Sequence, residues 1–373
     1  MKLFFIARVD LVDTASGISR KVFSQHKAMA GEADAYLLGY YGKELVLYHN
    51  GEIDRIIPVK MHRGVQISTE AVALAKELKI DCTYIRRFDC EPTAFAMLKK
   101  LKAINNMPIL WEIPTYPYDY EKIYSFDQIF RRQIDKIYRK RLGKYVDRIV
   151  TFSNEKVIFG VPTINTGNGL DVAEVRERRV LSENRDIHMI AAAVLRNWHG
   201  YDRLFNGMAA YYANGGNRNI VFHLVGDGPC LEEYRELVNK WNLEERVIFY
   251  GFLEKAQIDE VYDKCNLAVE SLGWHRSKVS VGTSLKTREY VAKGLPILAS
   301  TEMDIFPGGW EYAYYAPIDD SPIEIDQVVT FFDGIYDGTD PNELAFKIRK
   351  IAFERCDMKA MMKPVINYFL EVI

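Results

Sequence analysis

Short apolar runs alternate along most of the chain with longer stretches in which apolar residues recur at helical spacing. This alternation is typical of parallel sheets covered by helices, and it predicts the α/β fold class. The predicted strands form two series, Lys2–Ala7, Ala35–Tyr40, Cys82–Ile85, Pro108–Trp111 and Arg148–Phe152, followed by Ile187–Val194, Asn219–Val225, Arg246–Tyr250, Leu267–Val269, Pro296–Ala299 and Tyr312–Tyr315.

A highly charged stretch that ends at Ser182 separates the two series. We therefore predict two doubly wound, Rossmann-like domains, residues 1–166 and 167–355. In the last segment, 356–373, one helical face holds Met361, Val365, Phe369 and Leu370, so we expect this helix to pack back onto the first domain. Doubly wound sheets bind ligands beyond the carboxyl ends of their strands, which predicts a substrate cleft between two facing domains.

Composition limits the partners that the chain can attract. Its 373 residues hold 49 Lys and Arg against 51 Asp and Glu, a formal charge of −2, so no global field favours nucleic acid and an anion site must be local. The five cysteines include no C-x-x-C pair, and no stretch approaches 18 uncharged apolar residues. We expect a cytoplasmic protein with reduced thiols.

One segment of the first half is strongly basic. Residues 130–148 hold eight Lys and Arg against Asp135 and Asp147, a local charge of +6, with apolar residues on one predicted helical face, namely Phe130, Ile134, Ile137, Tyr138, Leu142 and Tyr145. Such a helix fits peripheral contact with the anionic inner face of a cytoplasmic membrane. An ordinary helix that covers a sheet and has a solvated basic face is the alternative.

The richest candidate site lies between Gly282 and Pro296. Ser284 or Thr283 caps a predicted helix that ends near Gly294, which places Lys286 in its first turn. A lysine there opposes the helix dipole unless an anion is bound, so it indicates a phosphate site; a solvated lysine is the alternative. Glu289, one turn later, suits two sugar hydroxyls or else an ordinary surface ion pair.

Other candidates follow strands of the second domain. Arg196 and His199 lie in a strand-to-helix loop where Arg offers a planar fork for phosphate oxygens, although either residue can instead cap the loop. Gly226 and Gly228 would let a nucleotide base or ribose approach the backbone, and an ordinary turn is the alternative. Arg276 follows another strand and is a candidate acceptor contact.

The first domain offers a glycine turn and an aromatic loop. Gly17 follows the first strand and opens a helix, an arrangement that binds anions through unpaired backbone N–H groups or is simply a capped turn. Glu112 is the candidate carboxylate near a reacting centre, and Tyr116 and Tyr118 suit stacking on acceptor sugar rings. Packing of this loop on its own domain is the alternative.

Several motifs occur in the order found in one family: Asn168–Asp171, Leu224–Gly228, Val247–Gly251 and Ser284–Pro296. The chain resembles bacterial glycosyltransferases of family 4, whose architecture of two Rossmann-like domains is called GT-B. Trp198–Arg203 and Ser284–Tyr290 are similar to the subgroup that builds capsular, exopolysaccharide or lipopolysaccharide chains.

The resemblance implies a retaining, metal-independent glycosyltransferase without a resident cofactor. Its donor would be a UDP- or GDP-linked sugar, and its acceptor a glycan or lipid-linked oligosaccharide in cell-surface polysaccharide synthesis. A nucleotide-sugar 2-epimerase of the same shape and a catalytically degenerate glycan-binding protein remain alternatives. The resemblance leaves the donor sugar, the linkage and the acceptor open.

The resemblance also assigns roles to residues of this chain. Lys286 and the backbone of Ser284 and Leu285 would contact the donor diphosphate, and Glu289 the nucleotide ribose. Arg196 and His199 would lie near the departing diphosphate. Gly17 would approach the donor phosphates, with Glu112 near the donor sugar.

Two positions depart from the family pattern. The first glutamate of the E-x(7)-E pair falls on Val281, and His199 stands where a lysine is usual. The contacts to the donor sugar are therefore expected to differ from those of the family, whereas binding of the nucleotide diphosphate is less affected.

Overall fold

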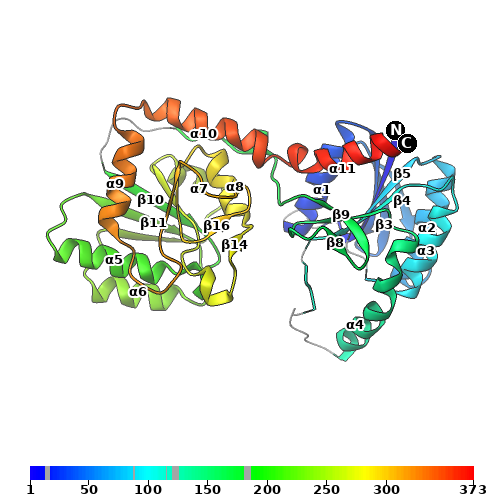
Figure 1. Ribbon diagram of the computed structural model, residues 1–373, viewed down its shortest axis with the longest axis horizontal. Coiled ribbons are helices and arrows are strands. Elements are labelled where there is room, and N and C mark those ends of the chain that lie inside the picture. Colours follow the sequence, from blue (N-terminus) through cyan, green and yellow to red (C-terminus); the bar gives the residue numbers. More distant parts are fainter. Residues whose placement is uncertain (13–16, 87–88, 115, 120–125, 180–185) are drawn as a thin grey trace. The chain divides into compact units, whose positions relative to one another are not determined.

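The computed structural model describes the chain except residues 13–16, 87–88, 115, 120–125 and 180–185 (Figure 1). The chain divides into two compact units, each with its own sheet and core. Unit 1 comprises Met1–Gly169 together with Met358–Ile373, and unit 2 comprises Leu170–Asp357. The α/β fold class is confirmed, because parallel strands and helices make up both units.

Unit 1 has a nine-stranded sheet in the order β4-β3-β2-β1-β5-β6-β7-β9-β8. All five strands predicted for this half are present, and they pair in parallel with their neighbours. An antiparallel extension through β3 and β4, and the pair β8–β9, were not predicted. The strands are β1 (Lys2–Asp10), β2 (Asp34–Tyr41), β3 (Glu44–His49), β4 (Glu52–Pro58), β5 (Cys82–Arg86), β6 (Ile109–Ile113), β7 (Arg148–Thr151), β8 (Val157–Ile158) and β9 (Val161–Asn165).

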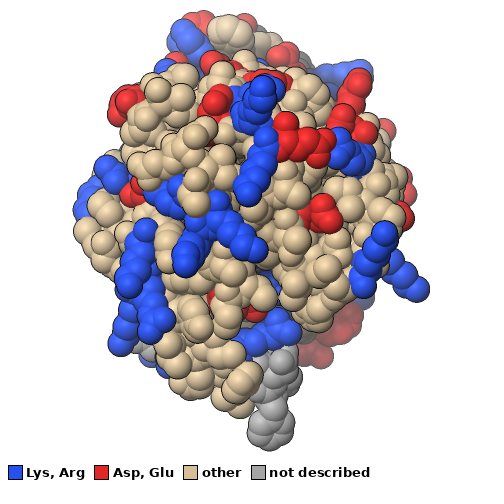
Figure 2. Space-filling model, turned by 90° about the vertical axis from the view of Figure 1, so that its right-hand side faces the viewer, with Lys and Arg blue, Asp and Glu red and all other residues tan. Residues whose placement is uncertain are grey.

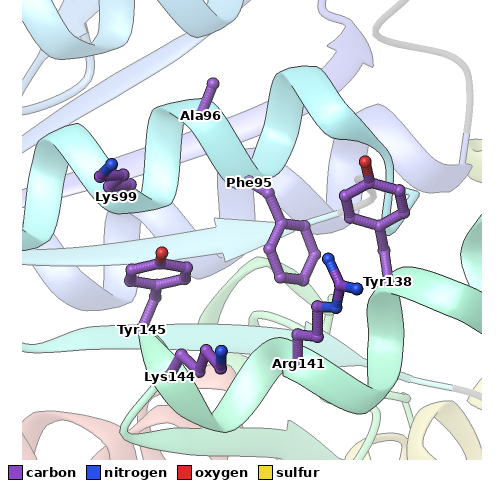
Figure 3. Close-up of a pocket in the computed structure, with 7 residues that line it drawn as sticks. All are labelled: Phe95, Ala96, Lys99, Tyr138, Arg141, Lys144 and Tyr145. Carbon is purple, nitrogen blue, oxygen red and sulfur yellow. The ribbon is translucent and has the colours of Figure 1, made fainter.

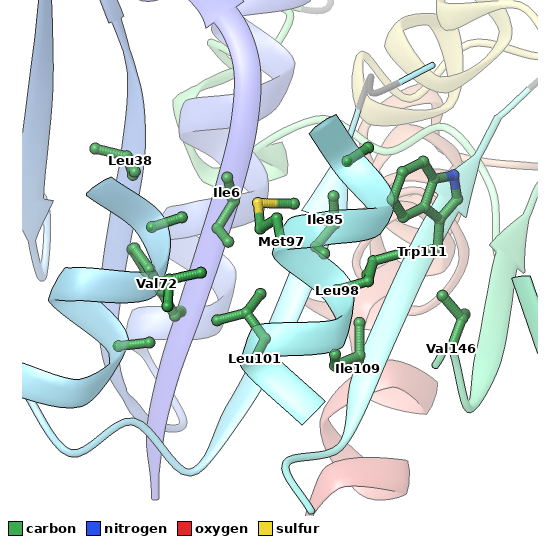
Figure 4. Close-up of a cluster of buried hydrophobic side chains, with 14 of the residues drawn as sticks. Ile6, Leu38, Val72, Ile85, Met97, Leu98, Leu101, Ile109, Trp111 and Val146 are labelled. Carbon is green, nitrogen blue, oxygen red and sulfur yellow. The ribbon is translucent and has the colours of Figure 1, made fainter. Parts of the chain in front are cut away.

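Helices cover both faces of this sheet, and each face has its own apolar cluster. The cluster in Figure 4 joins Leu98 and Leu101 to strand residues such as Ile6 and Ile109, all fully buried. Burial of such a side chain contributes about 1.5–3 kcal/mol. The helical elements of unit 1 are α1 (Gly17–Ala30), α2 (Arg63–Glu77), α3 (Pro92–Lys102), α4 (Phe126–Tyr138), the 3₁₀ helix η1 (Arg139–Lys144) and α11 (Met358–Val372).

The C-terminal helix α11 packs on the other face of this sheet, beside α1. Val365 and Phe369 are buried in a cluster that also contains Val22 and Met29 of α1. Leu370, which was predicted on the packed face, is 59% exposed. Ile18, in the first turn of α1, is 37% exposed and does not belong to this cluster.

The basic segment does not form one continuous amphipathic helix. The α-helix α4 ends at Tyr138 and gives way to η1, so Leu142 and Tyr145 do not continue its face. Leu142 is buried, but Phe130 is 66% and Ile137 59% exposed. The prediction of one helical face from Phe130 to Tyr145 was therefore wrong. The exposure of Phe130 and Ile137 also contradicts the alternative of a helix packed on the sheet at these two positions.

Unit 2 has a six-stranded parallel sheet in the order β12-β11-β10-β13-β15-β17. All six strands predicted for this half are confirmed, and only the short pair β14–β16 was missed among the described residues. The strands are β10 (Ile187–Ala192), β11 (Ile220–Val225), β12 (Val247–Gly251), β13 (Leu267–Val269), β14 (Val281–Gly282), β15 (Ile297–Ala299), β16 (Glu302–Met303) and β17 (Ala313–Tyr315).

The helices of unit 2 begin and end where local residues dictate. For example, Asp340 accepts hydrogen bonds from the N–H groups of Asn342 and Glu343, with Pro341 as the first helical residue of α10. The helical elements are η2 (Val172–Glu174), η3 (Asn197–His199), α5 (Tyr201–Ala213), α6 (Leu231–Lys240), α7 (Lys255–Tyr262), η4 (Trp274–Ser277), α8 (Leu285–Ala292), α9 (Ile325–Tyr336) and α10 (Pro341–Arg355).

Candidate functional site

The sheet of unit 2 contains a topological switch point. From β10 the chain proceeds outward through β11 and β12 on one side, and through β13, β15 and β17 on the other. In open parallel sheets ligands bind where the strand order reverses, beyond the carboxyl ends of the strands. The loops after β10 and β13 meet there, because Leu272 N–H donates to the carbonyl of His199 at 2.7 Å.

Helix α8 begins beside this switch point. Ser284 is its N-cap, and the Ser284 hydroxyl accepts from the Thr287 N–H at 3.2 Å. Gly294, with φ +71°, follows the last turn, so the predicted capped helix is confirmed with eight residues instead of about ten. The N–H groups of Leu285 and Lys286 lie in its first turn, which lacks intrahelical acceptors and attracts anions.

Lys286 is half-buried in this first turn. Its Nζ lies 3.1 Å from Glu270 Oε2 and donates to Ser271 Oγ at 3.0 Å, with the Tyr201 hydroxyl at 3.5 Å. The alternative of a freely solvated lysine is therefore wrong. An ammonium has three N–H donors, and the long third contact leaves capacity for a phosphate oxygen.

The loop after β10 adds an exposed guanidinium and a buried imidazole. Arg196 is exposed, and its guanidinium lies 6.0 Å from the centre of the Trp198 ring. The Arg196 N–H donates to Nδ1 of His199 at 3.0 Å, which leaves the proton of a neutral imidazole on Nε2. Arg196 is thus available to an anion, whereas His199 offers a neutral donor.

The environment of His199 explains why it is neutral. Burial and the positive charge of Lys286 together lower the pKa of His199 to about 3, against the opposing effect of Glu270. A group with this pKa carries no charge near pH 7. His199 therefore does not replace the charge of the lysine that is usual at this position.

Glu289 lies three residues after Lys286 and shares that side of α8. Burial raises the pKa of Glu289 above its ordinary value, although the Lys293 ammonium opposes the rise. A partly buried carboxylate in this place can accept hydrogen bonds from a pair of hydroxyls, so its predicted contact with ribose stays a prediction.

The glycine pair after β11 has a packing explanation. A Cβ at Gly226, where φ is +122°, would lie 1.9 Å from the Ala193 carbonyl oxygen. At Gly228, with φ +156°, it would lie 2.4 Å from the Leu195 carbonyl oxygen. Both glycines thus let the loops after β10 and β11 approach each other, which a side chain would prevent.

Arg276, predicted as an acceptor contact, is held by neighbours within unit 2. Its guanidinium donates to both carboxylate oxygens of Asp202 at 2.8 and 2.7 Å, to Asp320 at 2.7 Å and to Asn197. A guanidinium has five N–H donors, and these contacts use most of them. The arrangement favours a role in fixing the loop after β13.

In unit 1, Glu112 lies at the end of β6 inside the domain. Its carboxylate pairs with Arg86 and accepts from the Tyr84 hydroxyl at 2.7 Å and from Gln25 Nε2 at 3.1 Å. Burial would raise the pKa of Glu112, but the charges of Arg86 and Lys21 outweigh burial and lower it. The side chain is 0% exposed, so the structure does not place it where a sugar can touch it.

The aromatic loop after β6 packs on its own unit. The Tyr118 hydroxyl donates to Asp135 at 2.8 Å, and the rings of Tyr116 and Tyr118 make edge contacts with Phe159. This favours the packing alternative over acceptor stacking for the described part of the loop. Gly17 opens α1 with free space around its Cβ position, while the turn before it lies outside the described residues.

Sequence reasoning missed one residue of the site, Glu270. It follows β13 and is only 3% exposed. Burial would raise the pKa of Glu270, but Lys286 and hydrogen bonds from Ser284 and Ser271 outweigh it and lower the pKa to about 2. The signal in the sequence was a single acidic residue directly after a buried strand, where parallel sheets place functional groups.

Comparison with known proteins agrees with this geometry. Residues 184–314, which include β10 to β16 and α8, match the family model described as glycosyl transferases group 1. Among curated proteins, none matches the sequence significantly.

Solved structures resemble the chain over nearly its full length. Alr3699/HepE from Anabaena in complex with UDP is 14% identical, with all of both chains covered and a TM-score of 0.60. A glycosyltransferase from Rickettsia africae is 10% identical, with 99% of this chain and 98% of that chain covered and a TM-score of 0.63. The lipopolysaccharide outer core galactosyltransferase WaaB is 13% identical, with full coverage of both chains and a TM-score of 0.56.

At these identities the structural likeness establishes the fold. The chain has the GT-B fold, and residues 184–314 of its unit 2 match the family model of glycosyl transferases group 1.

Proposed function

We propose that this protein transfers a sugar, with retention of the anomeric configuration and without a metal ion, from a nucleoside diphosphate sugar to a glycan or lipid-linked acceptor in cell-surface polysaccharide synthesis. The observation behind the proposal is the convergence of positive groups at the switch point of unit 2. The first turn of α8, the Lys286 ammonium and the exposed Arg196 guanidinium all belong to it.

The chemistry follows from where charge develops during transfer. As the bond between the anomeric carbon and the diphosphate breaks, negative charge grows on the leaving oxygens. Fixed positive charges and backbone N–H groups at that place stabilise it most, because they need no rearrangement during the reaction. Lys286, Arg196 and the N-terminus of α8 supply these groups, and the neutral His199 adds a hydrogen-bond donor.

The structural relatives support a UDP-linked sugar as the donor and a glycan as the product. Alr3699/HepE was crystallised with UDP and with UDP-glucose, and WaaB is a galactosyltransferase of lipopolysaccharide. We propose UDP as the leaving group here on this basis.

Thermal unfolding with millimolar UDP, GDP, ADP, CMP and dTDP, each with and without EDTA, tests the proposal. At about 100 times Kd a ligand adds about 2.7 kcal/mol, enough to raise the melting temperature by several degrees. We expect a shift with UDP that EDTA leaves unchanged. Stabilisation by simple glycans in place of any nucleotide would favour the glycan-binding alternative, and conversion of the donor sugar without an acceptor would favour an epimerase.

Substitution of Lys286 tests the proposed mechanism directly. Loss of one charged hydrogen bond to the leaving group is expected to raise the barrier by about 1.5–3 kcal/mol, so Lys286→Ala should slow sugar transfer about tenfold to a hundredfold. Steady-state kinetics with a UDP-sugar measures this effect, and transfer at the wild-type rate would contradict the assignment.

We also propose that the region 130–148 contacts an anionic membrane surface. Phe130 and Ile137 are exposed, and so are Lys136 and Lys140 of the same segment, so this segment offers both apolar and basic groups to the solvent. A hollow with a volume of about 250 Å³ lies between α3 and η1 of the same segment. It is lined by Phe95, Ala96, Lys99, Tyr138, Arg141, Lys144 and Tyr145 (Figure 3). Its cations suit lipid phosphates, and its rings suit the interfacial region.

The charge of the whole chain is nearly balanced, but its distribution is not uniform. Figure 2 shows groups of Lys and Arg side chains across the middle of one face, whereas acidic side chains gather mostly in its upper half. No helix among the described residues is long and apolar enough to cross a membrane.

Sedimentation with lipid vesicles tests the membrane proposal. We expect binding to vesicles that contain phosphatidylglycerol, little binding to pure phosphatidylcholine, and release at high salt. The double substitution Phe130→Ser and Ile137→Ser should weaken binding, while Phe346→Ser, at an equally exposed phenylalanine of unit 2, should not. Equal binding by all variants would contradict the proposal.

A further inference from the structure

Glu270 occupies a fixed place at the centre of the unit 2 switch point. It follows β13, which lies between β10 and β15, and its N–H donates to the Leu298 carbonyl at 2.8 Å. Its side chain is 4% exposed. A carboxylate buried to this degree is tolerated only where partners satisfy it, so its contacts identify what it does.

The partners of Glu270 come mainly from the start of α8. One carboxylate oxygen accepts from the Ser284 hydroxyl and from Thr287 Oγ1 at 3.1 Å. The other accepts from the N–H of Ser271 and lies 3.1 Å from Lys286 Nζ. Glu270 thus contacts the N-cap and two residues of the first turn, the part of α8 to which the proposed function assigns the diphosphate.

These contacts fix the lysine in one position. A lysine side chain has four rotatable bonds and loses much freedom when it binds a ligand. Here Glu270 and Ser271 already hold Lys286 Nζ, while its side chain stays 17% exposed. A cation that is ordered before the ligand arrives stabilises developing charge without rearrangement.

Building on the proposed function, we propose that Glu270 is a positioning residue that holds Lys286 and the first turn of α8 ready for a diphosphate. Its action is indirect, because the carboxylate is buried and itself negative. Two effects of its removal have opposite signs. Loss of a negative charge near the site would remove Coulomb repulsion and so strengthen UDP binding, whereas loss of positioning would weaken it.

The test is a double-mutant cycle on UDP binding and sugar transfer with the full chain. Glu270→Gln keeps the shape of the side chain and removes its charge. We expect it to raise the Kd of UDP about 3- to 10-fold and to lower kcat, with Glu270→Asp intermediate. In the Lys286→Met background, Glu270→Gln should leave the Kd unchanged or lower it, because there is no ammonium left to position.

A matched control distinguishes positioning from general damage to the helix. Asp259 pairs with Lys293, the C-cap of the same helix, α8, at the opposite end from its first turn. Asp259→Asn removes the same charge and should keep the Kd of UDP within twofold, even where it lowers the melting temperature. The melting temperature of every variant is measured alongside.

The outcomes separate two failures. Unchanged or tighter UDP binding by Glu270→Gln in the wild-type background overturns the positioning role, and so does equal weakening in both backgrounds. If Lys286→Met itself leaves UDP binding unchanged, the proposed diphosphate site is wrong, and the role of Glu270 falls with it. Weakening by Glu270→Gln only where Lys286 is present supports the inference.

Discussion

Two buried carboxylates, one in each unit, lie directly at the carboxyl ends of parallel strands and pair with a cation. Glu112 of unit 1 pairs with Arg86, and their side chains are 0% and 7% exposed. Glu270 of unit 2 pairs with Lys286, whose side chain is 17% exposed and stands in the first turn of a helix. The first pair is closed within the domain, whereas the second presents its cation at a surface.

This difference shows that a carboxylate after a strand does not identify a site. The neighbours of Glu112 are Tyr84 and Arg86 of β5 and Gln25 of α1, and all of them contact its carboxylate inside unit 1. The neighbours of Glu270 belong to a helix N-terminus that still has unpaired N–H groups. An ion pair whose cation is enclosed by the protein is structural, whereas an ion pair whose cation is accessible to a ligand can be functional.

We expect the largest effect, a loss of stability, when the closed pair of Arg86 and Glu112 is broken. Arg86→Ala leaves the Glu112 charge buried without its cation, and such a change typically costs about 3–5 kcal/mol. Denaturant unfolding of unit 1, followed by hydrogen exchange, measures the loss. Arg55→Ala is the matched control, because Arg55 pairs with Glu77 at an exposed position of the same unit and should change stability little. A loss no larger than that of the control would contradict the structural role.

The next largest effect is expected at low pH, where protonation of Glu270 breaks its pair with Lys286. The folded-state pKa of Glu270, about 2, lies below its ordinary value of 4.5, so folding favours the ionised form. The resulting stability is complete above about pH 4.5 and disappears as the pH falls toward 2, with a total of about 3 kcal/mol. Unfolding of wild type and Glu270→Gln between pH 2 and 6 should therefore converge at low pH. Parallel curves for the two proteins would show that Glu270 does not titrate in this way.

We expect the smallest effect when the N-cap Ser284, which joins Glu270 to α8, is replaced. Ser284→Ala deletes the hydroxyl that accepts from the Thr287 N–H and donates to Glu270. Loss of an N-cap costs about 0.5–2 kcal/mol, and a modest weakening of UDP binding should accompany it because the first turn of α8 becomes less ordered. Ser284→Thr keeps the hydroxyl and should restore both. Titration calorimetry with UDP checks this, and an alanine variant that binds as tightly as wild type would contradict it.

Much of the fold could be predicted because the apolar pattern of each segment matches the burial of that segment in the sheet or in the helices that cover it. Every predicted strand is present, since buried parallel strands such as Cys82–Arg86 and Leu267–Val269 are short, continuous apolar runs between helical segments. The β3–β4 hairpin was missed because β4 is exposed along most of its length, and its isoleucines, Ile53, Ile56 and Ile57, do not alternate regularly with polar residues. The apolar stripe of 130–148 was misread because periodicity does not reveal where an α-helix ends.

The sequence by itself determined the α/β class, the strand series and the capped helix with Lys286 in its first turn, because these depend on residues close together in the chain. Only the tertiary structure decided what each charged group faces. Lys286 pairs with Glu270, 16 residues earlier, Arg276 is bound by Asp202, and Glu112 is enclosed by Arg86. Burial and pairing depend on strand order, and strand order brings together residues whose separation along the chain has no periodic signature.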